Sequence, residues 1–185
     1  MQLISPVFKK MPVSHKMSYI SVMAALSVIV NMYSIDIAGG LIKMSFVGVV
    51  CIISGAIFGP VYGFAIGFLG DAISFLVSAS GYAYSPLIGL SNGFYAAIAG
   101  LVFMIFKNRS LILKIIIAGI LTYFICTLLI TSLGIFLLFG SRYTFWAYML
   151  RRVIFQSPVS LVNIIASFLL IKAMASIKFF KVSLS

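Results

Sequence analysis

Acidic side chains are almost absent from this chain: its 185 residues contain two, against 13 lysines and arginines, which gives a net charge of +11. Charged residues of both signs make up only 8% of the sequence, whereas 63% of the residues are hydrophobic. A soluble domain carries about 25% charged residues, so this composition excludes a water-facing surface and predicts an integral membrane protein. The basic excess is better explained by lysines and arginines that flank membrane spans than by a nucleic-acid partner.

Reactive side chains are equally scarce. The single histidine, His15, precedes the first long apolar run, and Cys51 and Cys126 lie inside such runs, where a disulfide framework is not expected. No cluster of histidine, cysteine and carboxylate residues has the spacing of a metal site, and no nucleophile–base pair can be identified. The sequence therefore predicts no enzyme, no cofactor, no metal and no ATP hydrolysis by this chain.

Long apolar runs, by contrast, fill most of the sequence. A helix needs about 20 residues to cross the hydrocarbon core of a bilayer, and Gly59-Pro60 between the second and third runs predicts a hairpin with almost no loop. The expected fold class is an all-α integral membrane protein with six transmembrane helices. We expect a cytoplasmic segment at 1–16, a membrane domain at 17–177 and a cytoplasmic tail at 178–185, with helices at 17–35, 44–58, 61–79, 87–106, 113–139 and 147–175.

The basic residues also predict how the chain is oriented. Cytoplasmic loops carry an excess of lysine and arginine, and most of these residues fall on one side of the six expected spans. An N-in, C-in arrangement places the following residues in the cytoplasm: Lys9, Lys10, Lys16, Lys107, Arg109, Lys114, Lys172, Lys178 and Lys181.

The stretch FLGDAISFL, residues 68–76, places one of the two carboxylates in an apolar run. An ionised carboxylate that faces lipid costs at least about 2 to 3 kcal/mol, so Asp71 should face a cavity or a cationic partner. Two interpretations stay open: a direct ligand contact, or an ion pair with Arg151 or Arg152, early in the sixth run. Glycines at four-residue steps before Asp71 predict close helix packing; they are Gly59, Gly63 and Gly67.

Aromatic, polar and cationic residues gather at the ends of the spans that face away from the cytoplasm. An aromatic belt at the lipid headgroups explains some of them, but small-molecule sites also combine aromatic walls with a few convergent polar groups. A cationic rim would also attract an anion. The candidate binding residues are Asp71, Arg152, Arg151, Lys43, Tyr82, Tyr84, Ser91, Asn92, Arg142, Tyr143, Trp146 and Gln156.

The first run carries a small-residue surface formed by Ser21, Ala24 and Ala25. In isolation this pattern indicates ordinary helix packing. It becomes a candidate docking surface only if a membrane partner is expected.

The order of these motifs resembles the substrate-binding S component of energy-coupling factor (ECF) vitamin transporters. The block at 41–101 carries most of the resemblance, through its FGPVYG and LGD combinations. The folate-specific S components are the most similar. The resemblance implies a six-helix bundle in a bacterial plasma membrane, with a vitamin bound near its outer face. It also implies a transmembrane coupling subunit and two ATP-binding subunits as partners, with docking on Ser21 and Ala25.

The resemblance further implies roles for the candidate residues. Aromatic walls would stack on the rings of folate, and Asp71 would accept hydrogen bonds from the pterin or orient an arginine. Lys43, Arg142 and Arg151 would meet the glutamate carboxylates. The chain departs from the folate pattern at Met32 and at residues 131–134. Another vitamin or precursor (pantothenate, riboflavin or a queuosine precursor) therefore remains an alternative ligand, and a membrane scaffold or a lipid-modifying enzyme a more distant alternative function.

Overall fold

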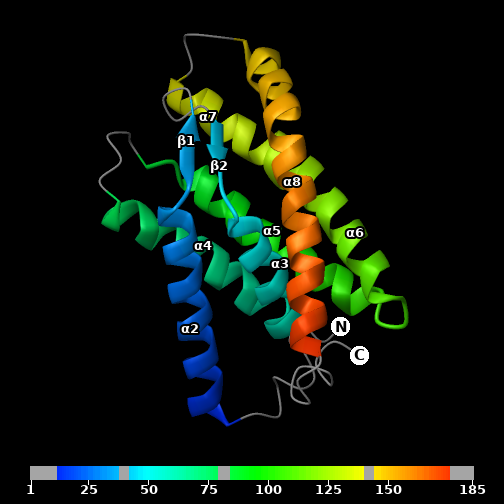
Figure 1. Cartoon of the computed structure of the whole chain (residues 1–185). Helices are drawn as coiled ribbons and strands as arrows, with labels where there is room; N and C mark the ends of the chain where they lie inside the picture. The colour runs from blue at the N-terminus through cyan, green and yellow to red at the C-terminus, as the bar shows by residue number, and fades with distance from the viewer. Residues whose placement is uncertain (1–11, 38–41, 79–83, 140–143, 176–185) are drawn as a thin grey trace.

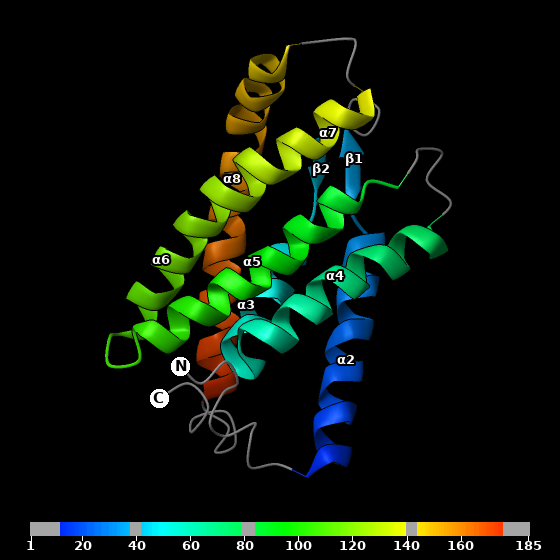
Figure 2. The same cartoon turned by 180° about the vertical axis from the view of Figure 1, so that it is seen from behind.

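The computed structural model describes residues 12–37, 42–78, 84–139 and 144–175, which form a helical bundle with one short β-hairpin (Figures 1 and 2). The elements, in chain order, are α2 (Val13–Met32), β1 (Ile35–Ile37), β2 (Ile42–Met44), α3 (Val47–Phe58), α4 (Pro60–Val77), α5 (Pro86–Ile105), α6 (Leu111–Thr122), the π-helix η1 (Tyr123–Ile130), α7 (Thr131–Phe139) and α8 (Phe145–Ala175).

Five helical stretches among the described residues are long and apolar enough to cross a membrane. The predicted helical class and five of the expected spans are therefore recovered. The expected second span, 44–58, differs: its first residue lies in β2, and helix α3 has only 12 residues, which is about 18 Å of helix. The stretches that are long enough are Val13–Met32, Pro60–Val77, Pro86–Ile105, Leu111–Leu138 and Phe145–Met174.

A β-hairpin lies between α2 and α3, where the sequence analysis predicted only a connection between two helices. Strands β1 and β2 are antiparallel, and Asp36 is paired in register with Lys43. The run Ile35–Ile37 alternates apolar and polar residues with two β-branched isoleucines, a pattern that suits a strand better than the end of a helix. In Figure 1 the hairpin lies at the end of the bundle away from the start of α2.

Helix α3 is the centre of the bundle. Every residue of α3 except Gly48 is buried, and the helix packs against α2, α4, α5 and α8 (Figure 1). In contrast, only Ser27 and Asn31 of α2 are buried. A helix that is apolar on all sides can be short when other helices, rather than lipid, surround it.

Glycines allow α3, α4 and α5 to approach one another closely. A Cβ atom at Gly55 would overlap the backbone oxygen of Ala96, and one at Gly63 would lie 3.0 Å from the Cα of Gly55. The predicted helix–helix contact is thus made by backbone against backbone, as expected for small residues in membrane bundles. The predicted break is also present: α3 ends at Phe58, Gly59 has φ 88°, and Pro60 opens α4.

We expect Gly55→Ala to destabilise the bundle by about 1 to 3 kcal/mol, because the added methyl group meets backbone atoms that cannot rotate away. Thermal unfolding in detergent measures the effect. Gly134→Ala is the matched control, because a Cβ there lies no closer than 3.2 Å to side-chain atoms of α5 and its N-cap. Equal melting temperatures for the two variants would contradict this account of the packing.

Candidate functional site

A polar cavity opens between α2, the β2–α3 connection, α4, α5, η1, α7 and α8. It contains about 800 Å³ of atom-free space, counted out into its open mouth. The lining residues are Asn31, Ser45, Val47, Gly48, Asp71, Ile88, Asn92, Tyr95, Thr127, Thr131, Ile135, Arg152, Gln156, Ser160 and Asn163.

Asp71 lies in this cavity and is held by two amides. Asn31 Nδ2 and Asn92 Nδ2 each donate a hydrogen bond of 2.9 Å to the same oxygen, Asp71 Oδ1. The carboxylate is 6% exposed, so without these donors it would be a buried charge with no compensation. Because both bonds end on Oδ1, Oδ2 can accept a further hydrogen bond, and it lies on the Gly89 side, 3.4 Å from where a Cβ of that residue would stand.

The local sequence around Asp71 explains why the two amides reach it. A Cβ at Gly67 would overlap the backbone oxygen of Asn92, and a Cβ at Gly70 would overlap the side chain of Ser27. These glycines bring α5 and α2 against α4 on both sides of the carboxylate. One buried charge therefore joins three helices.

Arg152 lines the same cavity from α8. Its side chain is 6% exposed, and neither Nε nor Nη1 has a hydrogen-bond acceptor within the described part of the chain. Among the described residues, the hydrogen bonds to the Asp71 carboxylate come from Asn31 and Asn92 rather than from Arg151 or Arg152. A buried guanidinium that lacks an acceptor is costly, so this cavity suits a ligand that brings an acceptor or a negative charge.

The polar lining follows one stripe of α8. Arg152, Gln156, Ser160 and Asn163 recur at steps of four, four and three residues, which places them on one helix face. At 1.5 Å per residue, the stripe runs for about 16 Å along the helix axis. The cavity thus offers separated polar contacts to an elongated ligand.

The π-helix η1 sits opposite this stripe and is fixed to α5. Ser91 Oγ and Thr131 Oγ1 donate to the backbone oxygen of Cys126 at 2.9 and 2.8 Å, and the two hydroxyl groups lie 2.7 Å apart. Thr127 and Thr131 both line the cavity. π-helical turns are frequent at functional sites.

The other predicted site residues are distributed unevenly. Asn92 and Gln156 line the cavity, whereas Ser91 joins α5 to η1 and is not among the lining residues. Arg151 is exposed. Trp146 is 66% exposed and packs edge-on against Phe145, with ring centroids 6.0 Å apart.

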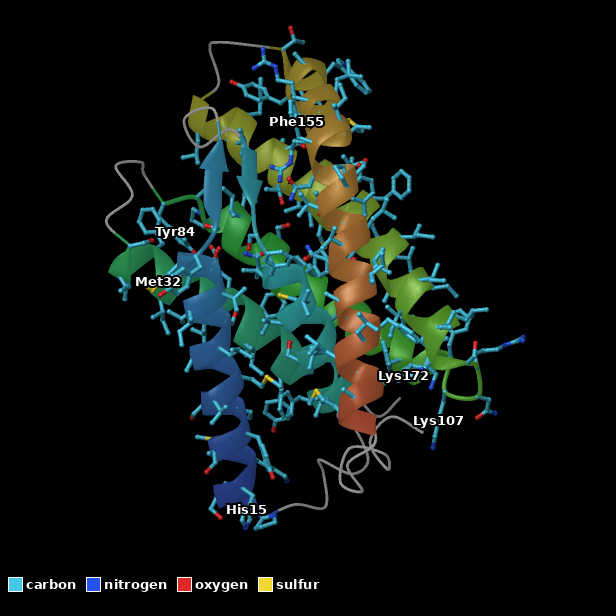
Figure 3. All side chains as sticks on the ribbon, viewed as in Figure 1. His15, Met32, Tyr84, Lys107, Phe155 and Lys172 are labelled. Carbon is cyan, nitrogen blue, oxygen red and sulfur yellow. The ribbon has the colours of Figure 1, made fainter. Side chains whose placement is uncertain are left out.

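Tyr84 lies beside the Asp71 site rather than in the lining. Its ring packs against Phe75, with centroids 5.0 Å apart, and its buried hydroxyl group has no hydrogen-bond partner among the described residues. Burial and the neighbouring Asp71 carboxylate raise the pKa of the Tyr84 phenol. Figure 3 shows Tyr84 near the hairpin end of the bundle.

Some predictions fall outside what the structure describes. Tyr82, Arg142 and Tyr143 lie beyond the described ranges, and for Lys43 only the backbone, in β2, is described. The predicted small surface on the first helix is present: Ser21 and Ala25 are exposed on α2, and Ala24 is half-buried.

Several lining residues were not predicted from the sequence. Asn31 is the one amide in its apolar helix, and Asn163 follows Gln156 by seven residues on one face of α8; these positions were the available signal. Ser45, Gly48 and Tyr95 carried no comparable signal, because serines, glycines and tyrosines are common throughout the chain. These residues approach one another only after β2 and α3 fold against α8.

Comparisons with known proteins show a family match and a similar fold. A family model described as "ECF transporter, substrate-specific component" matches residues 15–175. The fold is similar to the crystal structure of FolT bound with folic acid, with a TM-score of 0.73 and 21% identity over 85% of this chain and 92% of that chain. It is also similar to a solved S component of a bacterial ECF transporter, with a TM-score of 0.64 and 20% identity over 88% of this chain and 96% of that one.

A sequence relative has been described without an assigned function. The uncharacterized MG313 homolog of Mycoplasma pneumoniae (strain ATCC 29342 / M129 / Subtype 1) is 33% identical over 89 residues. The matched region spans 48% of this chain and only 30% of the length of that protein.

We expect Asn31→Leu and Asn92→Leu each to lower the free energy of unfolding by about 1 to 3 kcal/mol, because each removes a donor from a buried carboxylate. Thermal unfolding in detergent provides the measurement. Asn108→Leu, at an exposed position after α5, is the matched control and should be neutral.

The effect should also depend on Asp71. In an Asp71→Ala background, Asn92→Leu should cost much less than in the wild-type protein, because residues in contact are energetically coupled. Equal costs in the two backgrounds would show that Asn92 does not act through the carboxylate.

Proposed function

The chain belongs to the substrate-specific components of ECF transporters, and from this premise we propose that it binds folate or a related pterin. S components are substrate-binding transport subunits and are not themselves ATPases. The proposal adds that the ligand enters from the outer face and is delivered inward with a coupling subunit and two ATP-binding subunits.

The observation that supports the proposal most strongly is that one cavity contains both a hydrogen-bond acceptor, Asp71, and a hydrogen-bond donor, Arg152. Asp71 is fixed by Asn31 and Asn92 and offers only acceptors. Arg152 offers donors that have no acceptor among the described residues. A pterin ring presents N–H donors, and the remainder of folate carries carboxylates, so a single folate satisfies both groups.

The dimensions and the fold support the same ligand. The polar stripe on α8 extends for about 16 Å, which suits an elongated molecule better than a compact one. The similar fold of FolT bound with folic acid supports the choice of a folate over other vitamins.

The charge distribution supports the proposed orientation. In Figure 3, Lys107 and Lys172 lie toward the same end of the bundle as His15, away from the hairpin. Basic residues mark the cytoplasmic side. We therefore place the hairpin and the mouth of the cavity on the outer side of the plasma membrane, with both termini inside.

The exposed small surface on α2 supports the proposed partners. Ser21 and Ala25 leave a shallow surface on a helix that buries only two of its own residues. Small residues permit a second helix to approach closely. We propose that Ser21, Ala24 and Ala25 contact the transmembrane coupling subunit.

The test is titration of purified protein in detergent with folic acid by calorimetry. We expect one site per chain, and a loss of affinity of about 30-fold or more in Arg152→Met, because removing one partner of a buried charged pair costs about 2 to 5 kcal/mol. Arg151→Met is the matched control, since Arg151 is the exposed neighbour and does not line the cavity.

Two results would contradict the proposal. No binding of folic acid, with tight binding of another vitamin, would overturn the ligand and leave the family unchanged. Equal losses in Arg152→Met and Arg151→Met would show that the guanidinium in the cavity does not hold the ligand.

A further inference from the structure

Asn163 is a buried amide in the cavity lining, with its nitrogen bonded and its oxygen without a donor among the described residues. Its side chain is 6% exposed, and Nδ2 donates a hydrogen bond of 3.2 Å to the backbone oxygen of Ser45. The other end, Oδ1, is buried and has no donor among the described residues. The residue lines the same cavity as Asp71 and Arg152.

The Ser45 contact fixes which way the amide points. Rotating the amide by half a turn would place Asn163 Oδ1 against the backbone oxygen of Ser45, where two acceptors would face each other. The neighbouring Gly48 leaves the space for this arrangement, because a Cβ there would lie 3.0 Å from Asn163 Nδ2 and 3.2 Å from the Tyr95 hydroxyl group. The oxygen of Asn163 is therefore held as an acceptor.

Asp71 is fixed in the same way from the other side of the bundle. Its Oδ1 is occupied by the amides of Asn31 and Asn92, so Oδ2 is the oxygen left to accept a further hydrogen bond, and the residue lines the same cavity. Two helices that are distant in the sequence, α4 and α8, thus each hold one acceptor in place. Buried acceptors that lack a donor reject ligands that cannot supply one.

We propose that Asn163 is a specificity-determining residue, whose Oδ1 accepts a hydrogen bond from the head group of the ligand. The chemical class it selects is a flat nitrogen heterocycle with N–H groups in more than one direction, one for Asp71 and another for Asn163. This inference rests on the proposed function and deepens it, because it names the part of the ligand that the cavity recognises.

The experiment compares folic acid with two analogues that each lose a donor. In 2-desamino-2-methylfolic acid a methyl group replaces the amino group, and in 3-methylfolic acid the ring N–H is blocked. Wild-type protein should bind at least one analogue about tenfold or more weakly than folic acid. Asn163→Leu should reduce that preference to about threefold or less.

A second variant separates recognition from folding. Asn163→Gln keeps an amide with both a donor and an acceptor, so it should retain more of the preference than Asn163→Leu does. Asn108→Leu is the control for the substitution itself. If Asn163→Leu weakens folic acid and both analogues by the same factor, Asn163 only supports the Ser45 backbone, and the inference is overturned.

The outcome can be separated from that of the proposed function. If wild-type protein binds riboflavin instead of folic acid, the folate proposal fails, and Asn163 is tested with riboflavin and 3-methylriboflavin in the same variants. A preference for riboflavin that disappears in Asn163→Leu upholds the inference. Binding only of a ligand that lacks an N–H donor overturns it.

Discussion

A carboxylate buried within a membrane protein must find hydrogen-bond donors, and the rest of this structure depends on how Asp71 finds them. Asn31 and Asn92 supply both bonds from neighbouring helices. They can do so only because Gly67 and Gly70 let α5 and α2 approach α4 to backbone distance. The glycines and Asp71 are therefore structurally linked, because the close helix packing at the glycines positions the amides that bind the carboxylate.

The same arrangement decides what the cavity can bind. The hydrogen bonds of Asp71 come from Asn31 and Asn92, and Asp71 and Arg152 both line the cavity. Unpaired N–H groups of a buried guanidinium are costly, so we propose that a ligand which supplies an acceptor to Arg152 and a donor to Asp71 gains affinity from both contacts. Under the proposed function, the protein holds these groups in place before the ligand arrives, and a ligand that cannot pair with them is rejected.

The sequence predicted the helices, the Gly59–Pro60 break and the presence of Asp71 in a cavity, because composition, breaker residues and the cost of a buried charge are local properties. It did not predict the donors of Asp71. The sequence left open a ligand contact or an ion pair with Arg151 or Arg152, whereas the positions of Asn31 and Asn92 depend on helix packing. Trp146 was a candidate binding residue, but its side chain is 66% exposed. An aromatic residue at a membrane interface can contact either lipid or a ligand, and the sequence does not distinguish the two. Asn163 and Ser45 meet across 118 residues of sequence, a contact that no local pattern encodes.

The most direct test of the account is a structure of the protein determined with folic acid. The account predicts one molecule in the cavity, with its pterin ring between Asp71 and Asn163 and an acceptor group of the ligand at Arg152. The amides of Asn31 and Asn92 should remain on Asp71 Oδ1. A ligand bound elsewhere, or a ligand in this cavity while Asp71 forms an ion pair with Arg152, would contradict it.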